Sequence, residues 1–204
     1  MKIDEAASLI IPLKIALDVR EFPSAKRLAE YRPTSIRSGS ASMKPSVKEI
    51  IDAYNPHTPL EEAWTIPARW YIDPQIAELE RRTVFTRSWQ MIARADQVSE
   101  PGQYITCDLA GEPMLVVRGN DNILRGFFNV CRHHAAAVVT QCEGRANNLR
   151  CPYHGWTYSL EGELKGTPDF AGVCHFDRAS NGLVQVETEV WENWVFVKLD
   201  PSGV

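Results

Sequence analysis

The sequence has no long apolar run, no basic tract and no paired cysteine spacing. No uninterrupted apolar stretch in its 204 residues approaches the roughly 18 residues that a membrane-spanning helix needs, so a membrane partner is not expected. The net charge is −4 and no basic stretch is interleaved with aromatic residues, which disfavours nucleic acid as a partner. The five cysteines are an odd number without paired spacing, so a disulfide framework is disfavoured and a reducing compartment is favoured.

Acidic residues are also missing from part of the amino-terminal region. The first 48 residues contain seven serines, and residues 31–48 include no aspartate or glutamate. A basic, serine-rich, acid-poor leader has the composition of an organelle transit peptide, whereas the acidic residues Asp4, Glu5 and Asp18 argue against one. We therefore expect residues 1–48 to be a leader or disordered tail, with a transit peptide and a start codon placed too early as alternatives.

Residues 49–90 predict an amino-terminal arm that contains a helix. Asp73 is a suitable N-cap and Pro74 fits the first helical position. Ile76, Leu79 and either Thr83 or Val84 follow at helical spacing. Phe85 and Trp89 are expected to be buried against the domain that follows.

From residue 91 onward the pattern changes to short β-strands. Runs rich in β-branched and aromatic residues are separated by turn residues such as Gly111-Glu112-Pro113 and Glu161-Gly162. The expected strands are residues 104–109, 114–118, 123–130, 156–160, 163–165, 184–190 and 194–199. The pattern predicts a mainly β domain over residues 91–204, an antiparallel sandwich or small barrel.

The most specific feature is a pair of mixed cysteine–histidine motifs. Cys131-x-His133 and Cys151-x-x-His154 are separated by seventeen residues, 134–150. Two thiolates and two imidazoles are the ligand set of a Rieske [2Fe-2S] cluster, in which two histidines replace two cysteines on one iron. We expect Cys131 and Cys151 to hold one iron, and His133 and His154 to hold the other.

Zinc is the competing metal, because it also accepts two cysteines and two histidines. Zinc fingers pair cysteine with cysteine and histidine with histidine, whereas each motif here is mixed, so the pattern favours the cluster. His134 is interpreted as a non-ligand, because the Cys-x-His spacing selects His133. The three remaining cysteines are expected to be small buried hydrophobic residues: Cys107, Cys142 and Cys174.

The residues around both motifs resemble the loops of Rieske non-haem iron oxygenases. The segments that carry the likeness are Phe128 to Ala135 and Cys151 to Tyr158. In the arm, Pro59 to Ala63 and Ser88 to Gln90 resemble choline monooxygenase-type enzymes, and the likeness extends over roughly residues 47 to 201. The resemblance implies a Rieske fold with two cluster-binding loops. It also implies the electron-entry role in a monooxygenase that acts on choline or a related quaternary ammonium compound, as in glycine betaine synthesis.

The resemblance also implies partners and a second iron. In this family a catalytic domain holds a mononuclear iron by two histidines and a carboxylate. Only His175 follows His154, so we expect that domain to be absent from this chain. The family implies a ferredoxin or similar reductase as electron donor, a homotrimer, and a cytoplasmic location in bacteria or the chloroplast stroma in plants. The alternatives are a fragment of an aromatic-ring-hydroxylating dioxygenase and a stand-alone Rieske ferredoxin.

Cytochrome-type Rieske proteins differ from this sequence at three positions near the ligands. They join two further cysteines in a bridge and place a serine two residues after the second ligand histidine. Here those positions are Ala136, Tyr153 and Trp156. Fewer hydrogen-bond donors to the sulfurs leave the reduced cluster less stabilised, so we expect a reduction potential near the low end of the Rieske range, about −150 mV.

Overall fold

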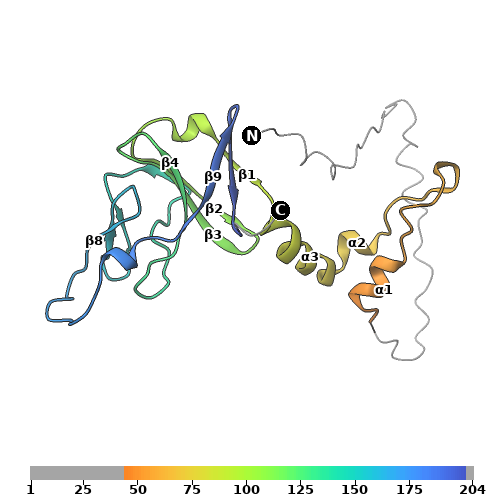
Figure 1. Cartoon of the computed structure of the whole chain (residues 1–204), viewed down its shortest axis with the longest axis horizontal. Helices are drawn as coiled ribbons and strands as arrows, with labels where there is room; N and C mark the ends of the chain where they lie inside the picture. Colours follow the sequence, from red (N-terminus) through yellow and green to blue (C-terminus); the bar gives the residue numbers. More distant parts are fainter. Residues whose placement is uncertain (1–43, 201–204) are drawn as a thin grey trace, which may run out of the picture. The chain divides into compact units, whose positions relative to one another are not determined.

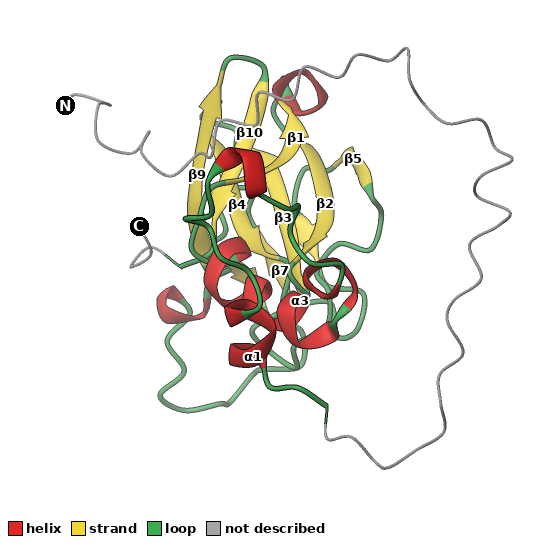
Figure 2. Ribbon diagram, turned by 90° about the vertical axis from the view of Figure 1, so that its right-hand side faces the viewer, coloured by secondary structure: helices red, strands yellow, loops and turns green. Residues whose placement is uncertain are grey.

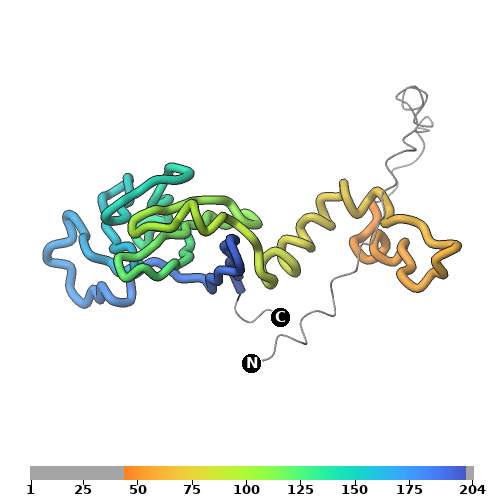
Figure 3. Tube along the Cα trace, turned by 90° about the horizontal axis from the view of Figure 1, so that it is seen from above, coloured from red at the N-terminus to blue at the C-terminus, as the bar shows by residue number. Residues whose placement is uncertain are grey.

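The computed structural model describes residues 44–200, which form an arm of short helices followed by antiparallel β-sheets (Figure 1). The leader predicted for residues 1–48 therefore lies almost entirely outside the described residues. Figure 3 follows the chain from the arm, in orange and yellow, into the strands, in green and blue. Among the described residues, no helix has the length and apolar character needed to cross a membrane.

Capping residues set the limits of the arm helices. Asp73 accepts a hydrogen bond from the Gln75 N–H (3.1 Å) and Pro74 is the first residue of its helix, which confirms the helix predicted there. Ser46 and Glu49 form a capping box at the start of the first helix, which begins at Val47. The helical elements are α1 (Val47–Asp52), η3 (Leu60–Glu62), α2 (Arg69–Ile72), α3 (Pro74–Glu80), the π-helical turn η4 (Arg81–Phe85), η5 (Ala95–Val98) and η6 (Ala179–Asn181).

The predicted burial of the aromatic residues at the end of the arm is wrong. Phe85 is 40% exposed and Trp89 is 42% exposed. Helical spacing predicts which side chains share a face, but it does not predict that another element covers the face.

The β-strands form two antiparallel sheets (Figure 2), which confirms the mainly β prediction. Seven strands have the order β1-β10-β9-β4-β3-β2-β5, and three have the order β6-β7-β8. The strands are β1 (Gln90–Arg94), β2 (Gln103–Leu109), β3 (Glu112–Arg118), β4 (Leu124–Phe128), β5 (Glu143–Arg145), β6 (Leu149–Arg150), β7 (Thr157–Tyr158), β8 (Leu164–Gly166), β9 (Gln185–Trp191) and β10 (Trp194–Lys198). The sequence pattern did not indicate β1, β5 or β6.

The turn between β2 and β3 differs from the predicted one. Glu112 and Pro113 are part of β3, where they pair with Leu109 and Asp108. The turn itself is the two residues 110 and 111, whose φ angles of 56° and 86° are both positive. Two positive φ angles characterise the tight hairpin turn that matches the twist of the strands it joins, and glycine adopts them without steric cost.

Strand β3 is buried on both faces, and this places the functional loops. Met114 and Val116 belong to one apolar cluster, whereas Leu115 and Val117 belong to a second cluster. Successive side chains on a strand point to opposite faces, so the large sheet has a core on each side. The second cluster also contains Cys131 and Cys151, and the predicted ligand loops therefore pack against one face of this sheet.

A surface ion pair holds the turn between β3 and β4. The Arg125 guanidinium donates two hydrogen bonds to the Asp121 carboxylate, at 2.8 and 2.6 Å, and the Ile123 N–H donates a third at 3.1 Å. These donors, Arg125 first, lower the pKa of Asp121 to about 2. The Glu161 carboxylate accepts the Asn120 N–H (2.9 Å), which joins this turn to the β7–β8 hairpin.

We predict that Asp121→Asn lowers stability at neutral pH and that the difference from the wild-type protein disappears below about pH 2. The folded pKa of Asp121 lies below its ordinary value of 3.8, so ionised Asp121 stabilises the fold above that value. The stabilisation is lost as the pH falls through about 2. Urea unfolding of both proteins over a pH series measures the difference. An equal loss of stability at both ends of the series would contradict the electrostatic explanation.

Candidate metal centre

Two loops bring the predicted ligands together. The loop between β4 and β5 carries Cys131 and His133, and the loop at the end of the β6–β7 hairpin carries Cys151 and His154. Both cysteines are 2% exposed and lie within the apolar cluster described above. The two cysteines, which are separated in the sequence by the strands β5 and β6, therefore share one apolar cluster in the fold.

The two loops have the same backbone geometry, and we call each one a knuckle (residues 131–136 and 151–156). In the first, Ala135 N–H donates to the Cys131 carbonyl (2.9 Å) and Cys131 N–H donates to the Ala136 carbonyl (2.8 Å). The equivalent bonds in the second knuckle, from Gly155 N–H to the Cys151 carbonyl and from Cys151 N–H to the Trp156 carbonyl, measure 3.0 and 2.8 Å. The fourth residue after each cysteine has a positive φ, 57° and 73°. The motif spacing did not indicate this equivalence.

Asn129 fixes the position of the first knuckle. This side chain is 4% exposed, and its Oδ1 accepts the backbone N–H groups of Val138 (3.1 Å) and Val139 (3.0 Å). Its Nδ2 donates to the Val139 carbonyl (2.7 Å), and its own N–H donates to the Pro113 carbonyl (2.7 Å). A buried amide whose donors and acceptors are satisfied by backbone groups makes the loop rigid. The knuckle is therefore tied to β3.

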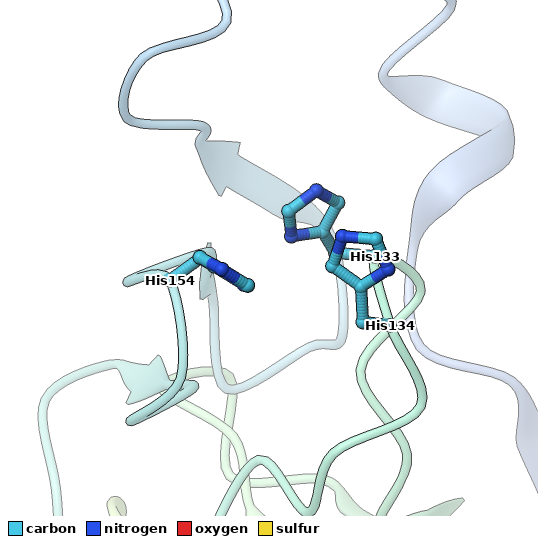
Figure 4. Close-up of side chains that lie close together, drawn as sticks. All are labelled: His133, His134 and His154. Carbon is cyan, nitrogen blue, oxygen red and sulfur yellow. The ribbon is translucent and has the colours of Figure 1, made fainter.

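Three histidine rings of the two knuckles lie close together (Figure 4). One nitrogen from each of His133, His134 and His154 lies within 4.8 Å of the others. The ring centroids of His133 and His134 are 3.8 Å apart, and those of His133 and His154 are 4.8 Å apart. His134 and His154 are exposed, whereas the Nδ1 atom of His133 is buried and has no hydrogen-bond partner. A buried polar atom without a partner needs an explanation, and a metal supplies one. This observation favours His133 over His134 as a ligand.

The local electrostatics favour a coordinating imidazole. Desolvation first, and then the neighbouring His134 and His154, lower the pKa of His133. The neutral form, which is the form that binds metals, is therefore favoured. Burial first, and a hydrogen bond with Cys131, raise the pKa of the Cys151 thiol, so metal binding must displace a proton from it.

Tyr158 contacts the first cysteine from within the core. Its hydroxyl oxygen accepts the Arg132 N–H at 3.0 Å and lies 3.3 Å from the Cys131 Sγ. Because the oxygen already accepts a hydrogen bond, its own O–H is free to donate to the sulfur. Burial first, and the contact with Cys131, raise the pKa of Tyr158, so the phenol stays protonated and remains a donor. The predicted loss of donors near the sulfurs is therefore partly offset by a residue that the motif comparison did not consider.

An aromatic wall covers one side of His133, and we define it as Trp156, Phe170 and Phe176. Trp156 stacks on His133 with ring centroids 4.7 Å apart and planes at 6°. Phe170 meets both rings edge-on, at 6.2 Å from His133 and 5.4 Å from Trp156. Phe176 contacts Trp156 (5.6 Å) and Phe170 (4.7 Å) in the same way. Two of these residues come from the loop after β8, which carried no signal in the sequence.

The residues present fit a [2Fe-2S] group. The same two loops carry two buried thiols, one buried imidazole nitrogen without a partner, and a second, exposed histidine. Soft thiolates and imidazoles are the ligands that iron–sulfur clusters accept.

The prediction that the other cysteines are buried is wrong for two of the three, because Cys142 and Cys174 are exposed and Cys107 is half-buried. All five cysteines are free.

Comparisons with known proteins agree with this geometry. The Rieske [2Fe-2S] domain family matches residues 88–177. The carnitine monooxygenase oxygenase subunit of Escherichia coli (strain K12) is 38% identical over 144 residues, covering 70% of this chain and 38% of that protein. The chloroplastic choline monooxygenase of Amaranthus tricolor is 36% identical over 173 residues, covering 84% of this chain and 38% of that protein.

A solved structure shows the same fold. It is a quaternary ammonium Rieske monooxygenase described for carnitine oxidation by gut microbiota and for inter-subunit electron transfer. The TM-score is 0.65 with 34% sequence identity, covering 70% of this chain and 39% of that one. The chain thus spans about two fifths of the length of the relatives that it matches.

We predict that Tyr158→Phe lowers the reduction potential of the reconstituted protein and leaves its visible spectrum in place. The variant removes the O–H donor to Cys131 and keeps the buried ring, and a lost hydrogen bond to a ligand sulfur destabilises the reduced state. Tyr153→Phe is the matched control, because Tyr153 is in the second knuckle and 64% exposed. Equal potentials for the two variants in a redox titration would show that the Tyr158 hydroxyl has no such role.

Proposed function

We propose that Cys131, His133, Cys151 and His154 hold a Rieske-type [2Fe-2S] cluster, within residues 88–177 that match the Rieske [2Fe-2S] domain family. The observation that carries this proposal is the buried, unpartnered Nδ1 of His133 beside two buried thiols. The cysteines would bind one iron as thiolates, and the two histidines would bind the other through ring nitrogens.

When bound, such a cluster accepts and releases one electron at a time. The protein's part is to hold the ligands in place and to control access. Asn129 and the knuckle hydrogen bonds fix the cysteines, and the aromatic wall excludes water from the His133 side. His154 is exposed, so its ring is the ligand through which electrons can pass to a partner.

The wider role is that of an electron-entry part of a Rieske monooxygenase acting on choline or a related quaternary ammonium compound. The similarity to carnitine and choline monooxygenases supports this substrate class. A ferredoxin or similar reductase would supply electrons. In a homotrimer, electrons would pass to a mononuclear iron held by a catalytic domain. The inter-subunit electron transfer described for the solved relative supports this assembly.

The subcellular location would depend on whether the protein comes from a bacterium or a plant. A bacterial protein would be cytoplasmic, in line with cysteines that lack the spacing of a disulfide framework. A plant protein would be in the chloroplast stroma, with residues 1–48 as its transit peptide, by analogy with the chloroplastic relative.

We predict that anaerobic reconstitution with iron and sulfide gives a Rieske-type visible and electron paramagnetic resonance spectrum. Cys131→Ser, Cys151→Ser, His133→Ala and His154→Ala should each abolish it, because the substituted side chains are poor or absent ligands for iron. The matched controls Cys142→Ser, Cys174→Ser and His134→Ala should keep it. A spectrum that survives Cys131→Ser but is lost with His134→Ala would overturn the ligand assignment. A wild-type potential near roughly +300 mV, at the top of the Rieske range, would contradict the expected value of about −150 mV.

The substrate class requires a separate test with an oxygenase subunit of the relatives' full length that contains this chain. Supplied with reduced ferredoxin and dioxygen, it should convert choline or carnitine to a hydroxylated product in step with oxygen consumption. Mass spectrometry identifies the product and an oxygen electrode measures the coupling. Oxygen consumption without product from any quaternary ammonium compound would reject this substrate class and leave the cluster assignment intact.

A further inference from the structure

We propose that the indole N–H of Trp156 donates a hydrogen bond to a sulfur of the [2Fe-2S] cluster. This inference rests on the proposed cluster site and deepens it. Trp156 would then be a positioning residue that stabilises the reduced state, in addition to its contact with His133.

Two buried side-chain atoms without hydrogen-bond partners indicate where this hydrogen bond would form. Among the described residues, only His133 Nδ1 and Trp156 Nε1 are buried side-chain nitrogen or oxygen atoms without a hydrogen-bond partner. The two atoms belong to rings that stack on each other at 4.7 Å. A bond to iron would explain the unpartnered Nδ1 of His133. The same bound cluster is the simplest explanation for the unpartnered Nε1 of Trp156, whose ring stacks on His133.

The acceptor must lie inside the protein. Trp156 is 2% exposed, and Phe170 and Phe176 pack edge-on against its ring. Solvent and partner proteins therefore cannot reach the indole N–H from outside. Buried indole N–H groups normally have an acceptor, and the indole can only donate. An anionic sulfide or thiolate is an acceptor that the bound cluster provides.

The second knuckle holds this side chain in place. The Trp156 carbonyl accepts the Cys151 N–H at 2.8 Å. This hydrogen bond fixes the Trp156 backbone at the end of the loop that carries Cys151 and His154. The equivalent residue of the first knuckle is Ala136, which has no side-chain donor. The first knuckle instead receives its donor from Tyr158, which lies 3.3 Å from Cys131. Each knuckle would thus receive one side-chain donor to sulfur.

Trp156 occupies the position at which cytochrome-type Rieske proteins have a serine that donates to sulfur. An indole N–H would therefore replace the serine hydroxyl as the hydrogen-bond donor at this position. Hydrogen bonds to cluster sulfurs stabilise the more negative, reduced state and raise the reduction potential.

The direct test is spectroscopic. Protein labelled with ¹⁵N at the indole nitrogen is reconstituted, reduced and examined by pulsed electron paramagnetic resonance. A weak ¹⁵N coupling to the reduced cluster is expected in the wild-type protein, lost in Trp156→Phe and retained in Trp191→Phe, whose residue is 66% exposed. An assembled cluster without ¹⁵N coupling overturns the inference and leaves the proposed function standing. Failure of the wild-type chain to assemble any cluster overturns both.

Redox titration separates a donor from a packing role. Trp156→Phe should keep the spectrum and shift the reduction potential downward. Phe176→Leu disturbs the same aromatic wall but keeps the indole N–H, so its potential should fall less than that of Trp156→Phe. An equal downward shift in both variants would assign the effect to packing and overturn the inference.

Discussion

The paired backbone hydrogen bonds that close each knuckle are the constraint on which the site depends. They fix Cys131 and Cys151 through main-chain atoms, so the sulfurs are positioned before any metal binds. The rest of the domain supports these bonds. Strand β3 buries both faces, and Asn129 ties the first knuckle to it through the Pro113 carbonyl. A preformed pair of thiols reduces the ordering that metal binding would otherwise require.

The sequence could predict the features that depend on local chemistry. The Asp73–Pro74 helix start is one, because a cap needs only the residues beside it. The convergence of the two mixed motifs is another, since their residue types indicate a shared group. The strands β5 and β6 could not be predicted, because they are only three and two residues long and form through pairing with β2 and β7. Alanine at position 135 likewise gives no signal for a φ of 57°.

The donors around the ligands could not be predicted for a different reason. Tyr158 lies 27 positions after Cys131 in the sequence, and the packing of the β6–β7 hairpin against the large sheet brings its hydroxyl to the sulfur. The same holds for Phe170, which belongs to a loop without a pattern of its own. Comparison by aligned position therefore counts a missing serine and overlooks donors that arrive from elsewhere in the fold.

The two sides of the site differ in access, and under the proposed function this difference would place electron transfer to a partner on one side. On one side, the aromatic wall covers the face of the His133 ring on which Trp156 stacks. On the other side, His134 and His154 are exposed and Tyr153, which is 64% exposed, lies against His154 with ring centroids 3.9 Å apart. Because the coupling that moves an electron weakens with distance, a partner gains most by docking where a ligand ring meets solvent. The fold presents one predicted ligand, His154, at such a surface, and the core around Trp156 and Tyr158 keeps the remaining ligands from direct contact with the partner.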